Sequence, residues 1–380
     1  MRPTVGQQRL PIALLGVLIL LCPSATTQKP PTGQRSVPIT LEGCSDKCGN
    51  ISIPFPFGME RSNCFLEGFE VVCNHTFNPP RAFLSSAPSL FSKDWPPNFA
   101  TLSSTVFQLT ANMYYSTVEA SMPSRHIDHT AGPVELLDVA VERGQARVYA
   151  AVSSDCSRNQ TITLIEQSIK LPSSSPFLFS AQGNELVGVG KSAVPILSGS
   201  LVGSDYQARC QSFVSSPGAD GAVDNGSCTT LGCCHQDMPS GINSTRLLFF
   251  HENRSQWETY PCAYGMLVQK SWYNFSPADM GGYLVLAKKY PRGVPVVLDF
   301  AIRNASCPPQ GQGQPSALCR SANSQCLNAT NGPGYVCMCM ENYSGNPLCW
   351  DLCQQQYQLI PHLMMTNEDN IYQQICSGIM

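Results

Sequence analysis

Charged side chains are scarce in this sequence, and no excess of positive charge is present. Only 13% of the 380 residues are Asp, Glu, Lys or Arg, and the formal net charge is −3. Loss of Arg2 and Arg9 with the N-terminal signal peptide described below would make the net charge more negative still. A chain of this charge is a poor partner for nucleic acid or for an anionic membrane surface, so we expect neither.

The sequence also lacks the compact motifs of common hydrolases. It contains neither a Gly-x-Ser-x-Gly elbow nor a His-Glu-x-x-His helix. His126 and His129 have a spacing that could hold a metal on a helix, but no helical pattern surrounds them. Acid pairs such as Asp128 and Glu135 could be imagined as a glycosidase couple, yet any chain with 26 acids offers such pairs. We therefore expect no enzyme activity, no cofactor and no metal.

Long apolar runs are absent except at the N-terminus. Residues 10–21 are apolar, follow two arginines and precede small residues, which predicts a signal peptide over residues 1–25. This run is shorter than the roughly 20 residues that a bilayer span needs, and no later stretch approaches that length. Residues 26–43 are rich in Pro, Gln, Thr and Gly and are expected to form a flexible leader. The mature chain is expected to be secreted.

Cysteine, in contrast, is abundant. The chain has 19 cysteines, and only Cys22 lies in the predicted signal peptide, which leaves an even number. In an oxidising compartment this predicts a framework of disulfides. Many acceptor sites for N-glycosylation agree with a secretory history. They are Asn50, Asn74, Asn159, Asn225, Asn243, Asn253, Asn274, Asn304, Asn328 and Asn342.

Residues 44–73 form a dense block in which four cysteines surround a short apolar segment. Two prolines within residues 51–58 fix φ and remove backbone donors, so this segment must be extended and cannot be a helix or a central strand. Gly58 is expected to allow a turn that a side chain would resist. Phe55 and Phe57 need burial that thirty residues can barely supply, which accounts for the surrounding cysteines.

This block resembles the galacturonan-binding module of plant wall-associated receptor kinases. The resemblance implies such a module over residues 44–110, with an insertion-like loop to about residue 130. The matching residues are Cys44, Cys48, Gly49, Asn50, Ile53, Pro54, Phe55, Pro56, Phe57, Gly58, Cys64, Gly68, Phe69, Glu70 and Cys73.

Residues 131–303 are expected to form a β-rich region of the same ectodomain. Two apolar runs, 134–141 and 145–152, predict a hairpin that turns at Gly144. Because no helical period is sustained, we predict a mainly β, disulfide-rich fold. Further strands are expected at residues 246–251, 283–287 and 296–302.

A second group of cysteines lies in this region, and all are expected in disulfides. Adjacent cysteines rarely bond each other, so Cys233 and Cys234 should have different partners. The others are Cys156, Cys210, Cys228 and Cys262. The family tends to have a cysteine where Lys191 stands and another soon after Cys210. Because both cysteines are missing here, either this chain lacks one disulfide of the family, or this variable region is misaligned with the family.

Residues 304–353 resemble an EGF-like module, because Gly-Tyr precedes a Cys-x-Cys pair and Tyr-Ser-Gly follows it. The resemblance implies the pairs Cys307–Cys326, Cys319–Cys337 and Cys339–Cys349. Cys353 and Cys376 would be left over, either to pair with each other or to remain free for dimerisation. The acidic start of a calcium-binding EGF module is missing, so no calcium site is expected. Residues 354–380 are expected to be an unstructured, Gln-rich tail.

Taken together, the resemblance implies the ectodomain of a receptor-kinase-like protein without its membrane span and kinase. Galacturonan has a carboxylate on each unmethylated ring, so its binding needs cations and flat aromatic faces. The candidate ligands are Lys47, Arg61, Arg81, Phe55 and Phe57. The same residues could instead be solvated charges and core aromatics.

The expected partners are acidic wall polysaccharide, meaning pectin and oligogalacturonides, and other extracellular proteins. The expected location is the interface of cell wall and plasma membrane. An alternative is a secreted protein-interaction module, such as a decoy or co-receptor, that does not bind pectin.

Overall fold

The computed structural model describes residues 39–90, 107–110, 131–158, 161–165, 167–201, 204–214, 226, 228, 231–249, 258–308, 318–349 and 352–355. The predicted signal peptide, most of the leader, most of the insertion-like loop with His126, Asp128 and His129, and nearly all of the tail lie outside these residues. Among the described residues, no helix is long and apolar enough to cross a membrane.

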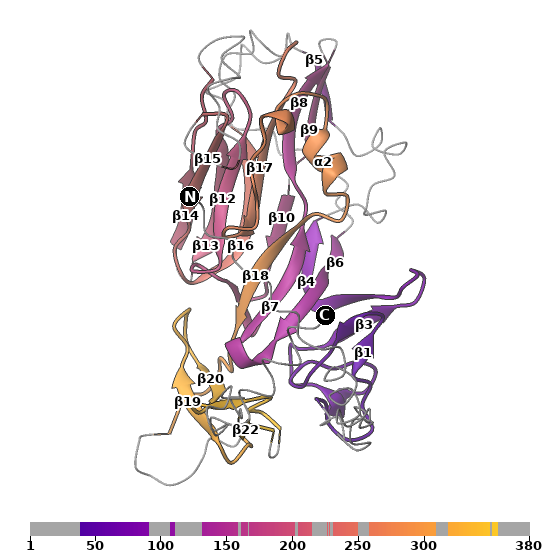
Figure 1. The fold of residues 1–380 in the computed structure, drawn as a ribbon, viewed down its shortest axis with the longest axis vertical. Helices are drawn as coiled ribbons and strands as arrows, with labels where there is room; N and C mark the ends of the chain where they lie inside the picture. The colour runs from indigo at the N-terminus through magenta and orange to yellow at the C-terminus, as the bar shows by residue number, and fades with distance from the viewer. Residues whose placement is uncertain are drawn as a thin grey trace, which may run out of the picture. The chain divides into compact units, whose positions relative to one another are not determined.

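Two antiparallel sheets contain most of the described strands, and the predicted mainly β class is confirmed (Figure 1). The larger sheet has the order β11-β18-β7-β6-β4-β10-β16-β13-β14, and β3 pairs with β4 outside this path. Its strands are β3 (Val71–Asn74), β4 (Arg81–Leu90), β6 (Ala131–Ala140), β7 (Gln145–Ala150), β10 (Gln167–Lys170), β11 (Phe177–Phe179), β13 (Pro195–Leu201), β14 (Ser204–Arg209), β16 (Ile242–Phe249) and β18 (Val294–Phe300).

The smaller sheet has the order β15-β12-β17-β8-β9-β5. Its strands are β5 (Phe107–Thr110), β8 (Ser153–Arg158), β9 (Thr161–Ile165), β12 (Asn184–Val189), β15 (Cys233–Asp237) and β17 (Cys262–Gln269). Three two-stranded sheets complete the β structure. They pair β1 (Lys47–Cys48) with β2 (Ile51–Ser52), β19 (Ser324–Asn328) with β20 (Tyr335–Cys339), and β21 (Tyr343–Ser344) with β22 (Gln354–Gln355). The helices among the described residues are short: η3 (Ser62–Cys64), η5 (Val141–Arg143), η7 (Pro277–Asp279) and α2 (Val285–Lys289).

The predicted hairpin is present as β6 and β7, which pair in an antiparallel register. Gly144 follows η5 with φ of 64°, a left-handed conformation that glycine adopts without strain. Along β7 the side chains alternate, so Val148 is buried while Arg147 and Tyr149 point to the other face. Because β18 pairs with β7, side chains of the two strands that point away from the core lie side by side on one face of the sheet.

Phenylalanines of the first module complete their burial against strands far away in the sequence. The Phe57 ring lies 5.1 Å from Phe69 and 5.3 Å from Phe300, centroid to centroid, and Phe69 lies 5.3 Å from Phe177. Edge-to-face pairs of this kind stabilise a core beyond their buried area. The first module therefore obtains from β11 and β18 the apolar partners that its own thirty residues lack.

The EGF-like unit packs against the same core. Tyr335 is buried and exchanges two backbone hydrogen bonds with Ile302, at 2.9 and 3.2 Å. Arg303 donates to the carbonyl oxygens of Asn331 and Pro333, and burial lowers the pKa of its guanidinium to about 10 against the opposing effect of Asp299. One hydrophobic cluster includes residues of all three predicted modules.

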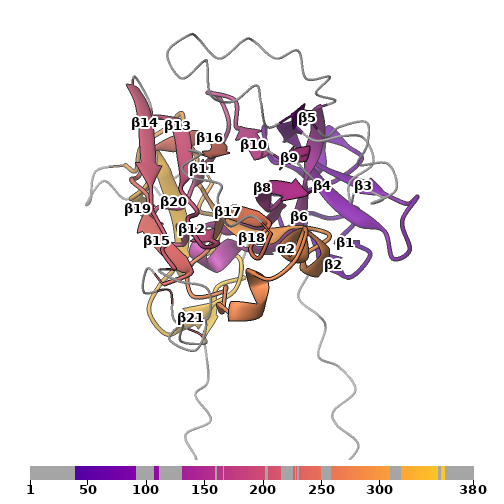
Figure 2. The same cartoon turned by 90° about the horizontal axis from the view of Figure 1, so that it is seen from above.

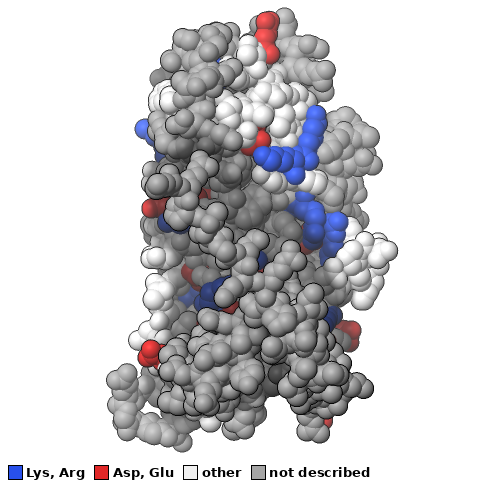
Figure 3. Space-filling model, in the orientation of Figure 1, with Lys and Arg blue, Asp and Glu red and all other residues white. Residues whose placement is uncertain are grey.

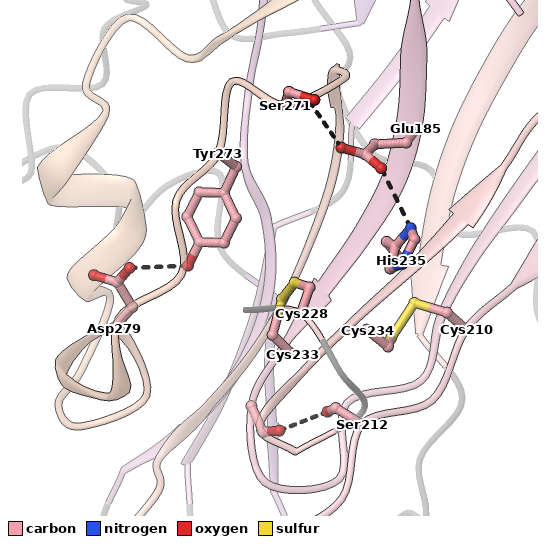
Figure 4. The surroundings of a disulfide bond; sticks show 11 residues. Glu185, Cys210, Ser212, Cys228, Cys233, Cys234, His235, Ser271, Tyr273 and Asp279 are labelled. Atoms are coloured by element: carbon pink, nitrogen blue, oxygen red, sulfur yellow. Dashed lines mark hydrogen bonds and ion pairs between the residues drawn. A yellow bond between two sulfur atoms is a disulfide. The ribbon is translucent and has the colours of Figure 1, made fainter. Parts of the chain in front are cut away.

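Eight disulfides join the described cysteines, including two pairs that the EGF resemblance implies, Cys307–Cys326 and Cys319–Cys337. Adjacent Cys233 and Cys234 have different partners, as Figure 4 shows. The remaining pairs are Cys44–Cys64, Cys48–Cys73, Cys156–Cys262, Cys210–Cys234, Cys228–Cys233 and Cys339–Cys353.

The third implied EGF pair, Cys339–Cys349, is wrong. Pairing of β21 with β22 draws the chain after Leu352 back along residues 343–344, so Cys353 is the cysteine that reaches Cys339. Cys349 instead turns into the core as a buried thiol. The expectation that Cys353 would be left over is therefore also wrong, and Cys376 lies outside the described residues.

The strand expected at residues 283–287 is also wrong, because α2 (Val285–Lys289) forms there. A short, continuous apolar run suggested a strand, but Leu, Ala and Lys are good helix formers. The Tyr264 hydroxyl accepts a hydrogen bond from the Val285 N–H at 2.7 Å and so satisfies a free donor of the first turn. Leu286 and Ala287 are the buried residues of this helix, which leads into β18 (Figures 1 and 2).

Candidate functional site

The candidate cations of the first module are attached to a scaffold of two disulfides. Lys47 is exposed on β1, and its neighbour Cys48 is bonded to Cys73 on β3. Because β3 pairs with β4, Asn74 lies opposite Arg81. The fold therefore places Lys47 and Arg81 on neighbouring elements, although 34 residues separate them in the sequence.

A glycine allows these elements to approach closely. At Gly49, whose φ is 57°, an added Cβ would lie 2.3 Å from the carbonyl oxygen of Pro80. No side chain fits at that distance, so only glycine at position 49 allows this turn to contact Pro80. The contact holds the turn that carries Lys47 next to Arg81.

Arg61 is the third candidate cation, and it belongs to a different part of the module. It is exposed and directly precedes η3, whose last residue, Cys64, is bonded to Cys44. The Cys44–Cys64 disulfide ties the segment after Arg61 to the segment just before Lys47. The two cations nevertheless belong to separate elements. Both are free of the apolar core and accessible to a ligand in solution.

Arg81 differs from the other two because its side chain is already engaged. It is 22% exposed, lies 3.6 Å from the buried carboxylate of Glu135 and stacks 4.2 Å from the Phe77 ring centroid. Cation–π contact and the ion pair fix the guanidinium in one orientation. Arg81 is therefore a positioned cation rather than a solvated one.

The expectation that Phe55 and Phe57 could stack on a sugar is wrong. Phe55 is 2% exposed and Phe57 is completely buried, so neither offers a face to a ligand. The carbonyl oxygen of Phe55 accepts a hydrogen bond from the Asn346 side-chain amide of the EGF-like unit, and the Arg320 guanidinium lies 5.9 Å from its ring. These phenylalanines hold the module to its neighbours.

Gly58 has a role other than the expected turn. Its φ is not positive, but an added Cβ would lie 2.3 Å from the carbonyl oxygen of Cys64. Close approach of two backbone segments, together with the bridge from Gly58 to Glu70, is what requires glycine here.

Glu135 and Arg292 were not predicted as part of the site, but in the structure both are linked to Arg81. Glu135 is 5% exposed and pairs with both Arg81 and Arg292, the latter 157 residues away. A carboxylate held by two arginines does not have the environment of a glycosidase acid. Residues 288–292 contain three cations in five residues, which is the one sequence signal that could have found Arg292.

The predicted glycosylation sites are accessible where the structure describes them. Asn50, Asn274, Asn304, Asn328 and Asn342 are exposed, and Asn74 and Asn243 are partly exposed; Asn159, Asn225 and Asn253 lie outside the described residues.

The first module and most of the rest of the chain are similar to known proteins. Residues 44–91 match the family model described as wall-associated receptor kinase galacturonan-binding. Wall-associated receptor kinase 1 of Arabidopsis thaliana is 26% identical over 321 residues, which cover 82% of this chain and 34% of that protein. The chain is therefore similar to wall-associated receptor kinases over most of its own length.

Other relatives agree with this assignment over shorter stretches. Wall-associated receptor kinase 5 of Arabidopsis thaliana is 30% identical over 175 residues, 45% of this chain and 22% of the relative. Wall-associated receptor kinase-like 5 of the same plant is 59% identical over 34 residues, 9% of this chain and 5% of the relative. The chain thus spans about a third of the length of the first of these kinases, and no solved structure matches it.

Proposed function

We propose that this protein acts outside the cell, at the boundary of wall and plasma membrane, by binding acidic galacturonan without any catalytic step. The observation that supports this most strongly is the match of residues 44–91 to a galacturonan-binding family, on a scaffold that presents Lys47, Arg61 and Arg81. The proposed ligands are pectin and oligogalacturonides with free carboxylates.

Individual contacts at such a site are weak. An exposed ion pair contributes only about 0.2–1 kcal/mol, so one sugar carboxylate cannot hold the protein. Several contacts engaged along one polymer add through their effective concentration. Affinity should therefore rise with the length of the oligogalacturonide, and it should fall with methyl esterification and with salt, which screens exposed charges.

The test is retention of the purified glycoprotein on de-esterified and on methyl-esterified pectin. The double variant Lys47→Gln, Arg61→Gln should bind de-esterified pectin about tenfold more weakly than the wild type, because two contacts are lost. A matched control, Arg143→Gln with Lys170→Gln, removes two exposed cations of other elements and should bind like the wild type. Arg81 is left intact because its loss would also disturb Glu135.

Equal retention of the wild type on the two pectins would contradict the proposal. That result would favour the alternative, a secreted module that recognises another extracellular protein. Retention of the double variant at the wild-type level would keep galacturonan as the ligand but remove Lys47 and Arg61 from the site.

A further inference from the structure

Arg81 belongs to a row of side chains that crosses the larger sheet, and we call it the cross-strand row. It comprises Arg81 on β4, Glu135 on β6, Tyr149 on β7 and Arg292 immediately before β18, and these four strands are neighbours in the sheet. Arg292 binds the carboxylate of Glu135, and its guanidinium lies 4.5 Å from the Tyr149 ring centroid. Through Arg81, the row connects the first module with the body of the protein.

Arg292 is the last residue of an unusually basic stretch, residues 288–292, which we call the basic turn. Its five residues include three cations, and no acid occurs between Asp279 and Asp299 in the sequence. The turn is closed by a hydrogen bond from the Gly293 N–H to the Tyr290 carbonyl oxygen at 2.9 Å. Figure 3 shows lysine and arginine side chains gathered on one side of the molecule, at the level of α2 in Figure 1 and just below it.

Besides Glu135, which pairs with Arg292, another acid contacts the basic turn, and it is buried and engaged. Asp279 is 3% exposed, accepts a hydrogen bond from the Tyr273 hydroxyl at 2.8 Å and pairs with Lys289 at 2.9 Å (Figure 4 shows the contact with Tyr273). Burial, together with the charge of Asp279, raises the pKa of Tyr273 far above its ordinary range, so the tyrosine remains a neutral donor. Burial opposes the charge of Lys289, but contact with Asp279 outweighs it and raises the pKa of this lysine.

Flat aromatic surface lies beside these cations. Trp272 is 39% exposed, and its ring centroid is 5.1 Å from that of Tyr290, a member of the basic turn. The Lys289 ammonium lies 5.4 Å from the same Tyr290 ring. A partly exposed tryptophan beside cations offers an apolar face on which a pyranose ring can stack.

The balance of charge on this surface favours an anion. Its cations are Arg81, Lys288, Lys289 and Arg292, and its acids Glu135 and Asp279 are both buried beneath them. Two further acids lie at its edges and are engaged: exposed Glu70 accepts a hydrogen bond from Ser85, and Glu185 accepts one from the Ser271 N–H beside Trp272. A ligand that approaches from solvent therefore meets mainly cations and aromatic edges.

We infer that this surface, the cross-strand row with the basic turn and Trp272, is a second contact region for acidic polysaccharide, outside the residues 44–91 that match the galacturonan-binding family. The cations bind sugar carboxylates, and Trp272 stacks on a pyranose ring. The inference rests on the proposed function and extends it, because one polymer chain would contact both the first module and the body of the protein.

The test compares binding to long, de-esterified polygalacturonate with binding to polyglutamate, which has carboxylates but no sugar rings. Trp272→Ala should weaken binding to polygalacturonate about fivefold, because a contact aromatic is lost, and leave binding to polyglutamate unchanged. Lys288→Gln should weaken both about two- to fivefold. Matched controls are Phe213→Ala, an aromatic that is 51% exposed elsewhere, and Lys170→Gln. Because Asn274 begins an acceptor site two residues after Trp272, glycans are first trimmed to a single sugar.

The outcomes separate this inference from the proposed function. If the wild type fails to bind polygalacturonate, both are overturned. If the wild type binds and the variant lacking Lys47 and Arg61 is weakened, while Trp272→Ala and Lys288→Gln bind like their controls, the second contact region is overturned and the proposed function stands. Loss of polygalacturonate binding in Trp272→Ala alone among the aromatic variants supports the inference.

Discussion

Arg292 donates a hydrogen bond to the carboxylate of Glu135 across 157 residues of sequence. This contact joins the start of β18 to β6, and Arg81 approaches the same carboxylate from β4. A carboxylate that is 5% exposed needs such partners, because an unpaired buried charge is strongly unfavourable. The three side chains therefore link the first module to the body of the protein.

Replacement of Glu135 tests this link. Glu135→Gln removes the charge that both arginines bind and should lower the free energy of unfolding by about 1–3 kcal/mol. Urea unfolding with the disulfides intact measures the change. Glu142→Gln serves as the control, since Glu142 is exposed in η5. An equal midpoint for the two variants would show that Glu135 has no structural role.

The revised disulfide pattern of the EGF-like unit can be checked directly. Peptide mapping of the non-reduced protein should recover a cross-linked peptide that contains Cys339 and Cys353, with Cys349 outside that link. The pairing of β21 with β22 is the physical basis of this expectation. Recovery of a Cys339–Cys349 peptide would instead restore the pairing that the EGF resemblance implies.

The buried thiol of Cys349 predicts a dependence of stability on pH. Burial raises the pKa of this thiol from 9.0 to about 11, although the charge of Arg320 opposes the shift. The folded state thus favours the protonated form, so its contribution is complete below pH 9 and is lost as pH rises towards 11. The loss should be about 1.4 kcal/mol for each pH unit in that window.

Measurement of this effect needs a comparison between two proteins. Rapid-mixing urea unfolding at pH 8 and at pH 10.5 would be carried out for the wild type and for Cys349→Ala, whose side chain does not titrate. The difference in stability between them should shrink as pH rises. A constant difference would mean that the thiol is not buried in its neutral form.

The docking of the EGF-like unit depends on Asn346. Its side-chain amide donates to the carbonyl oxygen of Phe55, and its side-chain oxygen accepts from the Leu348 N–H at 3.0 Å. Asn346→Ala leaves both backbone groups without this partner and should cost about 1–3 kcal/mol of stability. Gln325→Ala, at an exposed position of β19, is the control in the same urea series, and an equal loss in both would refute the contact.

Local sequence patterns predicted those parts of the fold that depend on residues close together in the sequence. Gly144 and its two apolar flanks predicted the β6–β7 hairpin, and the adjacency of Cys233 and Cys234 predicted separate partners. The helix α2 was missed because a five-residue segment is too short for its period to be seen. Cys353 was misassigned because strand pairing, rather than cysteine spacing, decides which thiol meets Cys339.

The candidate site was only partly predictable for a similar reason. Lys47 and Arg61 are exposed, as a binding cation must be, and sequence alone identified them. Whether a phenylalanine is a ligand or a core residue depends on distant strands, and β11 and β18 bury Phe57. Arg292 and Trp272 were not predicted, because only the fold places them on the same surface as Arg81.

The central claim, recognition of acidic galacturonan, is tested most directly by titrating the purified glycoprotein with oligogalacturonides of increasing length at several salt concentrations. We expect saturable binding whose dissociation constant falls as the oligomer lengthens, rises with salt and is lost on methyl esterification of the same oligomers. Binding that is absent, or that is equal for the free and the esterified oligomers, would contradict the account.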